Sequence, residues 1–254
     1  MTLVSDFYKK VWPVDVGVPL IRLGGSGDGS YLLPDCISGI ELCLSPGTCG
    51  IVDFEKELAN IYGIPCLLCD PAEDAPSELP EFLKFDRVAL SSTNGPSTVT
   101  LESWMEKYGL IDASPILLTM DIEGGEIDVI NSLSDSIINK IRIATIEFHY
   151  LHLLHEQNPR PYALGVLQAI DKLQKYFDIV HFKPNNNCAF QVDTTEYGRQ
   201  TLYTCVEITF LHKQNRKKSP VKLLPSMLPN RLDKDNVIYK PHADYSSYCT
   251  YLNE

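Results

Sequence analysis

Residues 39–71 read GIELCLSPGTCGIVDFEKELANIYGIPCLLCDP, and this stretch decides the fold class. Its first apolar run, 39–47, closes with Pro and Gly, as a buried strand does before a turn. The next segment carries Phe54, Leu58 and Ile61 at helical spacing and stops at a glycine. A second apolar run then ends in Asp-Pro. A strand, a helix and a strand in this order favour a parallel sheet with helices on its faces.

The same alternation continues along the chain. The pattern predicts strands at 39–47, 64–71, 85–92, 115–125, 141–149, 178–187 and 203–212. It predicts helices at 52–63, 101–110 and 126–140, and a further helix along the stripe Leu164, Leu167, Ile170, Leu173 and Phe177. In such α/β sheets ligands bind beyond the carboxyl ends of the strands, so chemistry is expected at that edge.

Two segments lie outside this alternation and set the expected domain limits. Residues 1–38 are interpreted as a structured loop segment that precedes the sheet, and residues 1–212 as one catalytic domain. Residues 213–254 are interpreted as a basic tail or lid, since they hold eight basic and four acidic residues. The formal charge of the whole chain is −11, so residues 1–212 carry −15. A surface this acidic repels phosphate backbones, which argues against nucleic acid as a partner.

Composition limits the class of protein. The 254 residues are 44% hydrophobic and 22% charged, values typical of a globular domain. Neither a signal-peptide core nor an apolar run of roughly 20 residues is present, so we expect a cytoplasmic protein without a membrane span. Eight cysteines are present. Several lie in apolar runs, and we expect all eight to be reduced. Cys66 and Cys69 should face opposite sides of their strand, which argues against a shared metal.

The turn LSPGTCG, residues 44–50, is the first candidate ligand site. It lacks G-x-G-x-x-G, which weakens a nicotinamide-binding interpretation. Ser45, Gly47 and Gly50 allow a close approach of the backbone, and the helix that follows favours an anionic group. An ordinary strand-to-helix turn is the alternative. Asp70 ends the next strand, where an acid can accept hydrogen bonds from ribose hydroxyls or simply belong to an Asp-Pro turn.

MDIEGGE, residues 120–126, is the densest group of polar side chains. Asp121 closes an apolar strand at the ligand-binding edge, where an acid needs a partner such as a substrate hydroxyl, an ammonium group or a metal. Glu126 has a simpler explanation, since an acid in a first helical turn is stabilised by the helix dipole. Glu123 is open to both interpretations.

Histidine and asparagine side chains follow the later strands. Glu147 and His149 are two residues apart, hence on one face, and suit a base with an orienting partner. His181, Asn185 and Asn187 end the next strand, and amide groups suit hydroxyl-rich ligands, although turn residues are the alternative. The nearby His152 and His155 match no zinc signature and are interpreted as ordinary imidazoles.

Taken in order, these motifs resemble the FkbM-type S-adenosylmethionine-dependent methyltransferases over about residues 20–212. The matching pieces are RLGGSGDGSYLLPD, LSPGTCGIVDFEKELA, CDP, TLESW, MDIEGGE, IEFH, HFKPNNN and EITFL. One departure is the first motif, where common members have G-x-N-x-G and this chain has SPGTCG. More weakly, the chain resembles the methyltransferase domain of a multidomain glycan-building enzyme of large DNA viruses, which implies glycan-synthesis domains or enzymes as partners.

The resemblance implies the class I methyltransferase (Rossmann-like) fold, a seven-stranded sheet with strands one to six parallel, strand seven antiparallel and helices on both faces. It implies S-adenosylmethionine as cofactor, bound near Gly27 and Asp28, with Ser45 and Gly47 beside its methionine part and Asp70 at its ribose. Asp121 would border the same site. The implied activity is O-methylation of a sugar or glycan hydroxyl.

Methyl transfer to an alcohol needs alignment and removal of one proton. Asp121 and His149 are the expected bases, with Glu147 orienting the imidazole. The same residues could instead bind Mg²⁺, because carboxylates suit hard cations. A nicotinamide-dependent oxidoreductase and a non-catalytic binding module are the remaining alternatives. The former is disfavoured by the absent glycine fingerprint and Tyr-x-x-x-Lys pair.

Overall fold

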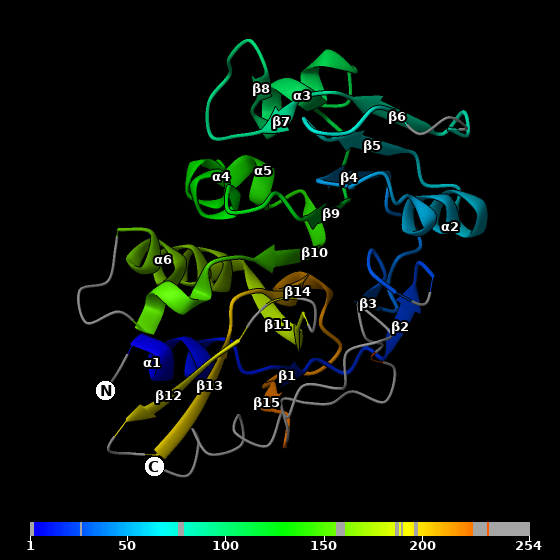
Figure 1. Cartoon of the computed structure of the whole chain (residues 1–254). Helices are drawn as coiled ribbons and strands as arrows, with labels where there is room; N and C mark the ends of the chain where they lie inside the picture. The colour runs from blue at the N-terminus through cyan, green and yellow to red at the C-terminus, as the bar shows by residue number, and fades with distance from the viewer. Residues whose placement is uncertain are drawn as a thin grey trace.

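The computed structural model describes residues 3–25, 27–75, 79–155, 161–185, 188, 190–195, 198–225 and 233. Its centre is a seven-stranded sheet with the order β11-β14-β10-β9-β4-β5-β6 (Figure 1). The strands are β4 (Leu42–Pro46), β5 (Cys66–Cys69), β6 (Leu83–Asp86), β9 (Ile116–Met120), β10 (Ile141–Phe148), β11 (Phe177–Pro184) and β14 (Val206–His212).

Strand direction confirms the predicted fold. The pairs β4–β5, β5–β6, β4–β9 and β9–β10 are parallel. Strand β14 is antiparallel to both β10 and β11, so β11 runs with the other five. The sheet is therefore six parallel strands with one antiparallel strand inserted next to the edge, and all the predicted central strands are present.

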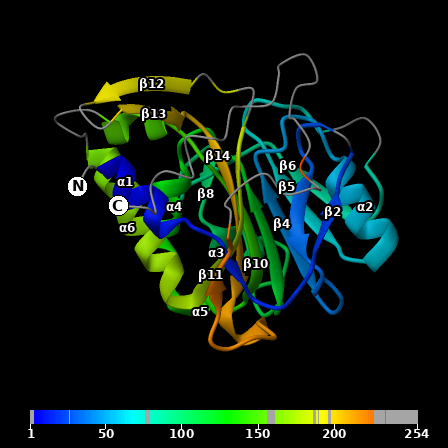
Figure 2. The same ribbon diagram turned by 90° about the horizontal axis from the view of Figure 1, so that it is seen from below.

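Helices cover both faces of the sheet. They are α1 (Leu3–Lys10), α2 (Asp53–Tyr62), α3 (Leu101–Lys107), α4 (Glu126–Ser132), α5 (Asp135–Ile138) and α6 (Pro161–Tyr176). Figure 2 shows α1 and α6 on one side of the sheet and α2 on the other. Two hydrophobic clusters fill these layers, and Cys69 belongs to one while Cys66 belongs to the other. The two thiols thus face opposite sides of β5, as predicted.

The local sequence explains where helix α2 ends and where helix α3 begins. Helix α2 ends at Gly63, which has a φ of 69° and donates its N–H to the Ala59 carbonyl, as a left-handed cap does. Helix α3 begins after Thr100, whose hydroxyl accepts the Ser103 N–H at 3.3 Å. Both ends agree with the prediction.

The predicted apolar stripe of α6 is partly wrong. Leu164 is 46% exposed, and Phe177 is the first residue of β11 and not part of the helix. The buried stripe consists of small and branched residues: Ala163, Gly165, Val166, Ala169, Ile170 and Leu173. A Cβ at Gly165 would lie 2.9 Å from Ile127, so small residues let α6 approach α4 closely. Ile170 and Leu173 of the predicted stripe therefore lie on the contact face, whereas Leu164 does not.

Several small elements were not predicted. Residues 1–38 hold α1 and the hairpin β2 (Leu20–Leu23)–β3 (Tyr31–Pro34), where a loop segment was expected. A second hairpin joins β12 (Phe190–Thr195) to β13 (Gly198–Tyr203), and a short pair joins β7 (Ala89–Leu90) to β8 (Thr98–Val99). Two 3-10 helices are η1 (Leu151–His155) and η2 (Lys213–Asn215).

The beginning of the C-terminal segment is bound to the N-terminal segment. Strand β15 (Lys222–Leu223) pairs antiparallel with β1 (Val14–Asp15). Lys218 forms a 2.5 Å ion pair with Asp15, and the Trp12 indole N–H donates to the Leu224 carbonyl at 2.8 Å. Beyond residue 225 only residue 233 is described.

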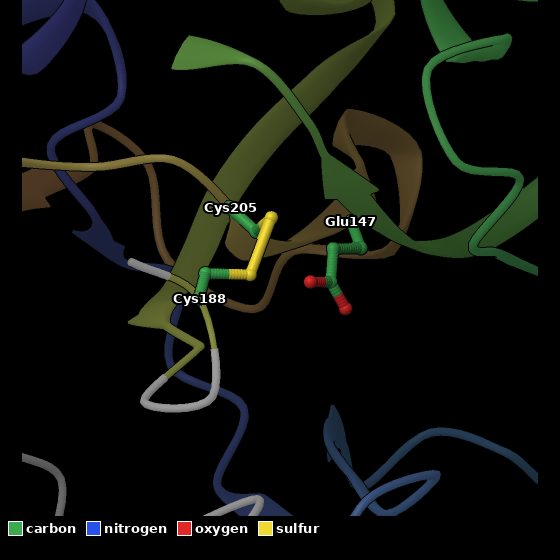
Figure 3. A group of neighbouring side chains, drawn as sticks. All are labelled: Glu147, Cys188 and Cys205. Carbon is green, nitrogen blue, oxygen red and sulfur yellow. A yellow bond between two sulfur atoms is a disulfide. The ribbon is translucent and has the colours of Figure 1, made fainter. Parts of the chain in front are cut away.

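The expectation that all cysteines are reduced is wrong for one pair. Cys188 and Cys205 form a disulfide, and Figure 3 shows it close to Glu147. Pairing of Pro184 with Val206 across β11 and β14 brings the two cysteines together. Free thiols are found at Cys36, Cys43, Cys49, Cys66 and Cys69, and Cys249 lies outside the described residues. Within the described segments, none of the helices has the length and apolar character that a membrane crossing requires.

Candidate functional site

A small cavity opens at the carboxyl end of β4. Asp28, Ser45, Gly47 and Asp121 line it, together with Gly29, Tyr31, Thr48, Cys49, Ile51 and Glu55. Three of these side chains are acids, and none is lysine or arginine. Four of the six predicted cofactor residues, from three separate segments, thus meet at one cavity, whereas Gly27 and Asp70 are not among the lining residues.

Gly47 fits this position for a steric reason. Its φ is 82°, and a Cβ there would lie 1.5 Å from the Asp121 carbonyl oxygen. The Asp121 N–H in turn donates to the Pro46 carbonyl at 3.1 Å. Glycine therefore allows the turn after β4 to touch the end of β9, which places the cavity directly beside Asp121.

Asp70 lies at the end of β5 and is buried. Its two carboxylate oxygens accept the N–H of Cys49 at 3.0 Å and of Ala72 at 2.9 Å. The first of these bonds ties Asp70 to the turn at the cavity wall. Each oxygen keeps a second lone pair, which could accept a hydrogen bond from a ribose hydroxyl. A ribose-binding role for Asp70 stays a prediction.

A second group of side chains surrounds His149, which lies directly after β10 and is 5% exposed. Its Nε2 lies 3.5 Å from Asp121 Oδ1, 3.4 Å from Glu123 Oε2 and 3.9 Å from Glu147 Oε1. Its Nδ1 is 2.9 Å from Glu126 Oε1, a hydrogen bond. Asp121 and His149, predicted from neighbouring strands, are therefore adjacent.

Glu126 makes the orienting contact that was expected of Glu147. It is fully buried, and the same oxygen, Oε1, also accepts the N–H groups of Ile122 at 3.3 Å and Gly124 at 3.0 Å. A carboxylate on Nδ1 favours a proton on that nitrogen, which leaves Nε2 facing Asp121. The position of Glu126 in the first turn of α4 explained why an acid stands there, but the sequence did not predict its hydrogen bond to His149.

The burial of these carboxylates sets their acidity. Burial raises the pKa of Asp121 to about 7, opposed by His149 and assisted by Glu123. Burial also raises the pKa of Glu147 well above its ordinary value, with Asp121 and Glu207 adding to the effect. Burial alone would lower the pKa of His149, but the bond to Glu126 and the surrounding carboxylates outweigh it and raise that pKa to about 9.

The residues predicted to bind substrate lie at the far side of β10. The Asn185 amide donates to Glu147 Oε1 at 2.9 Å, and His181 Nε2 lies 2.9 Å from Asp233 Oδ1. Both side chains are buried. Asn187 lies outside the described residues, and a substrate role for any of the three stays a prediction.

A ligand set for a divalent cation exists in the described part of the chain. One ligand atom each from Asp121, Glu123 and His149 lie within 4.8 Å of one another, and this set of two oxygens and one imidazole nitrogen suits Mg²⁺ or Mn²⁺. A second group, Glu147 with Cys188 and Cys205, offers no thiolates because its sulfurs are joined (Figure 3).

Residues 42–192 match the family model described as the methyltransferase FkbM domain. No curated protein matches the sequence significantly.

Three similar solved structures are a fibrillarin/Nop5p complex and two methyltransferases. A fibrillarin/Nop5p complex gives a TM-score of 0.39 at 12% identity, covering 68% of this chain and 73% of that one. A precorrin-6y C5,15-methyltransferase from Geobacter metallireducens GS-15 gives 0.31 at 10%, covering 68% and 80%. A variant 16S rRNA adenine methyltransferase from Catenulisporales acidiphilia gives 0.32 at 11%, covering 76% and 98%. TM-scores this low carry no argument about function.

Proposed function

Since the chain belongs to the family of FkbM-domain methyltransferases, we propose that it transfers a methyl group from S-adenosylmethionine to a hydroxyl of a sugar or glycan. S-adenosylmethionine is the methyl donor of this family. The cavity beside Asp121 fits such a donor, because its walls carry acids and no basic side chain to oppose a cationic ligand.

One observation supports a hydroxyl as acceptor. The Asp121 carboxylate and His149 Nε2 lie 3.5 Å apart at the strand ends beside the cofactor cavity. An alcohol becomes an adequate nucleophile only as its proton is removed, and a base with a pKa near the working pH is the most effective. Asp121, with its pKa raised to about 7, meets that requirement.

Bound S-adenosylmethionine supplies an electrophilic methyl group. Asp121 would accept the acceptor hydroxyl proton as the methyl group passes from the sulfonium sulfur to the oxygen, with the neutral thioether as leaving group. The protonated imidazole of His149 stabilises the ionised Asp121 before the transfer, and Glu126 fixes the imidazole through Nδ1. Asn185 holds Glu147 beside the same imidazole. The concentration of acids disfavours an anionic acceptor, which supports a neutral saccharide.

The test is transfer of a radiolabelled methyl group across a panel of neutral sugars, oligosaccharides, phenols and amines. We expect label on at least one saccharide and loss of most transfer in Asp121→Asn. Saccharide methylation that survives EDTA assigns Asp121 and His149 as the base, whereas loss with EDTA and recovery with Mg²⁺ assigns them to the cation. Transfer confined to amines or phenols would contradict the proposed acceptor class.

A further inference from the structure

Glu55 is a buried acid that the proposed chemistry does not use. It lies in the first turn of α2, is 3% exposed, and lines the cavity that contains Ser45 and Gly47. An acid that merely stabilised the helix dipole could stay in water, as its neighbour Asp53 does. Burying Glu55 instead costs solvation, and such a cost calls for a partner.

The hydrogen bonds around Glu55 leave it incompletely satisfied. Thr119 donates its hydroxyl to Ser45 at 2.9 Å, and Ser45 donates its own hydroxyl to Glu55 Oε1. The hydroxyl protons of Thr119 and Ser45 thus both point along the hydrogen-bond series that ends at Glu55. Its other oxygen, Oε2, is buried and has no hydrogen-bond partner among the described residues. Burial raises the pKa of Glu55 to about 7, in keeping with a carboxylate that lacks a counter-charge.

The cavity defines what could supply the missing donor. None of its lining residues is basic, and Asp28 and Asp121 add negative charge. A cation with N–H groups would both donate a hydrogen bond to Glu55 Oε2 and offset this negative charge. The cofactor carries two cationic groups, a sulfonium and an α-ammonium, and only the ammonium has protons to donate.

We propose that Glu55 is the counter-charge that binds the α-ammonium of the cofactor's methionine moiety, with Ser45 holding the carboxylate in place. Strand β4 ends in Ser45 and Pro46 and carries no acid of its own. In this assignment Glu55 of helix α2 supplies the negative charge at the turn after β4. The inference rests on the proposed cofactor and not on the proposed acceptor. Its test therefore gives a result that is independent of saccharide methylation.

Calorimetric titration without acceptor tests the assignment. Three ligands are compared: S-adenosylhomocysteine, its deaminated analogue that keeps the carboxylate, and 5′-methylthioadenosine, which lacks the whole amino-acid part. All three lack the sulfonium, so differences among them report the amino-acid portion. Wild-type protein should bind S-adenosylhomocysteine about 10- to 100-fold more tightly than the deaminated analogue, the range expected for a charged hydrogen-bonded pair.

Glu55→Gln keeps the shape of the side chain and an oxygen for Ser45 while removing the charge. It should weaken S-adenosylhomocysteine by the same factor and leave 5′-methylthioadenosine within about twofold, since that ligand reports the rest of the pocket. Asp53→Asn is the matched control, because it removes an exposed acid from the same helical turn, and it should change none of the three affinities.

Two results would overturn the assignment. Equal affinity of wild-type protein for S-adenosylhomocysteine and its deaminated analogue would do so without any variant, whether or not Glu55→Gln folds. Equal weakening of all three ligands in a folded Glu55→Gln, checked by circular dichroism, would show that Glu55 only shapes the cavity.

Discussion

Asp121 carries the sharpest prediction about a single residue. Its pKa is raised to about 7 mainly by burial, and the base must be ionised to accept a proton. The kcat/KM for the cofactor should therefore rise with pH through about 7 and level off above it, because that parameter reports the free enzyme. The check is a pH profile between 5.5 and 8.5, roughly the range that brackets this ionisation. A flat profile would contradict the assignment.

Replacing Asp121 by Asn tests the same residue in a second way. The amide cannot accept the proton, so kcat should fall by about 10²- to 10⁴-fold. Binding of S-adenosylhomocysteine, measured by calorimetry, should change little by comparison. Turnover that stays at the wild-type level would show that another group removes the proton.

Glu126 offers a prediction about positioning. Its bond to Nδ1 is the leading influence that holds the pKa of His149 up at about 9 against the effect of burial. Glu126→Gln keeps an acceptor but removes the charge, so the pKa of His149 should fall. NMR titration of the imidazole protons measures this directly, with Glu123→Gln, an exposed neighbour, as the comparison. An unchanged His149 titration would mean that Glu126 serves only the start of α4.

Single residues also show which parts of the site the sequence predicts. Ser45, Gly47 and Asp121 were predicted because each lies at the carboxyl end of a strand, and parallel strands end at one edge. Glu55 was missed because it sits on a helix next to Phe54 and Leu58, where periodicity identifies the buried face without showing that a polar residue belongs to it. The signal was a lone acid among apolar neighbours at helical spacing.

At the scale of elements, long periodic segments were predictable and short ones were not. The seven central strands follow from apolar runs of ordinary length. Strands β2 and β3 instead flank the glycine-rich GGSGDGS, residues 24–30, and show too few alternating residues to indicate a hairpin. The disulfide was missed for a related reason. Cys188 follows three asparagines in the sequence, and only the pairing register of β11 with β14 brings it to Cys205.

The disulfide should stabilise the segment that holds β12 and β13. It spans 17 residues, a loop for which chain entropy gives about 3 kcal/mol. Cys188→Ser should therefore lower the free energy of unfolding by roughly that amount, measured by urea titration without reductant. Adding reductant should destabilise the wild type and leave Cys188→Ser unchanged. Equal stability of the two proteins under oxidising conditions would contradict the pairing.

At the scale of the whole molecule, charge divides between the acidic residues 1–212 and the basic segment that follows. The described part of that segment makes specific contacts, including the β1–β15 pair and the ion pair of Arg216 with Asp178 at 3.6 Å. The described residues 213–225 therefore pack on the acidic residues that precede them.

Truncation tests the contribution of this segment to stability. Ending the chain at residue 212 removes β15 and uncovers Trp12, which is 5% exposed in the intact fold. We expect the midpoint of thermal unfolding to fall by several degrees, at least about 4 °C if 2 kcal/mol is lost from a chain of this size. Ending the chain at residue 225 keeps these contacts and should retain most of the stability. Equal melting of the two truncated chains would show that β15 contributes nothing.

The proposed function requires that the strand-end site place a methyl group on a saccharide oxygen. The most direct measurement is an NMR spectrum of the product formed with S-adenosylmethionine labelled by ¹³C at the methyl group. We expect a carbon resonance characteristic of a methyl ether on a sugar ring. This resonance should be absent when Asp121→Asn replaces the wild type. Labelled methyl on nitrogen, sulfur or carbon, or no labelled saccharide from any acceptor in the panel, would contradict it.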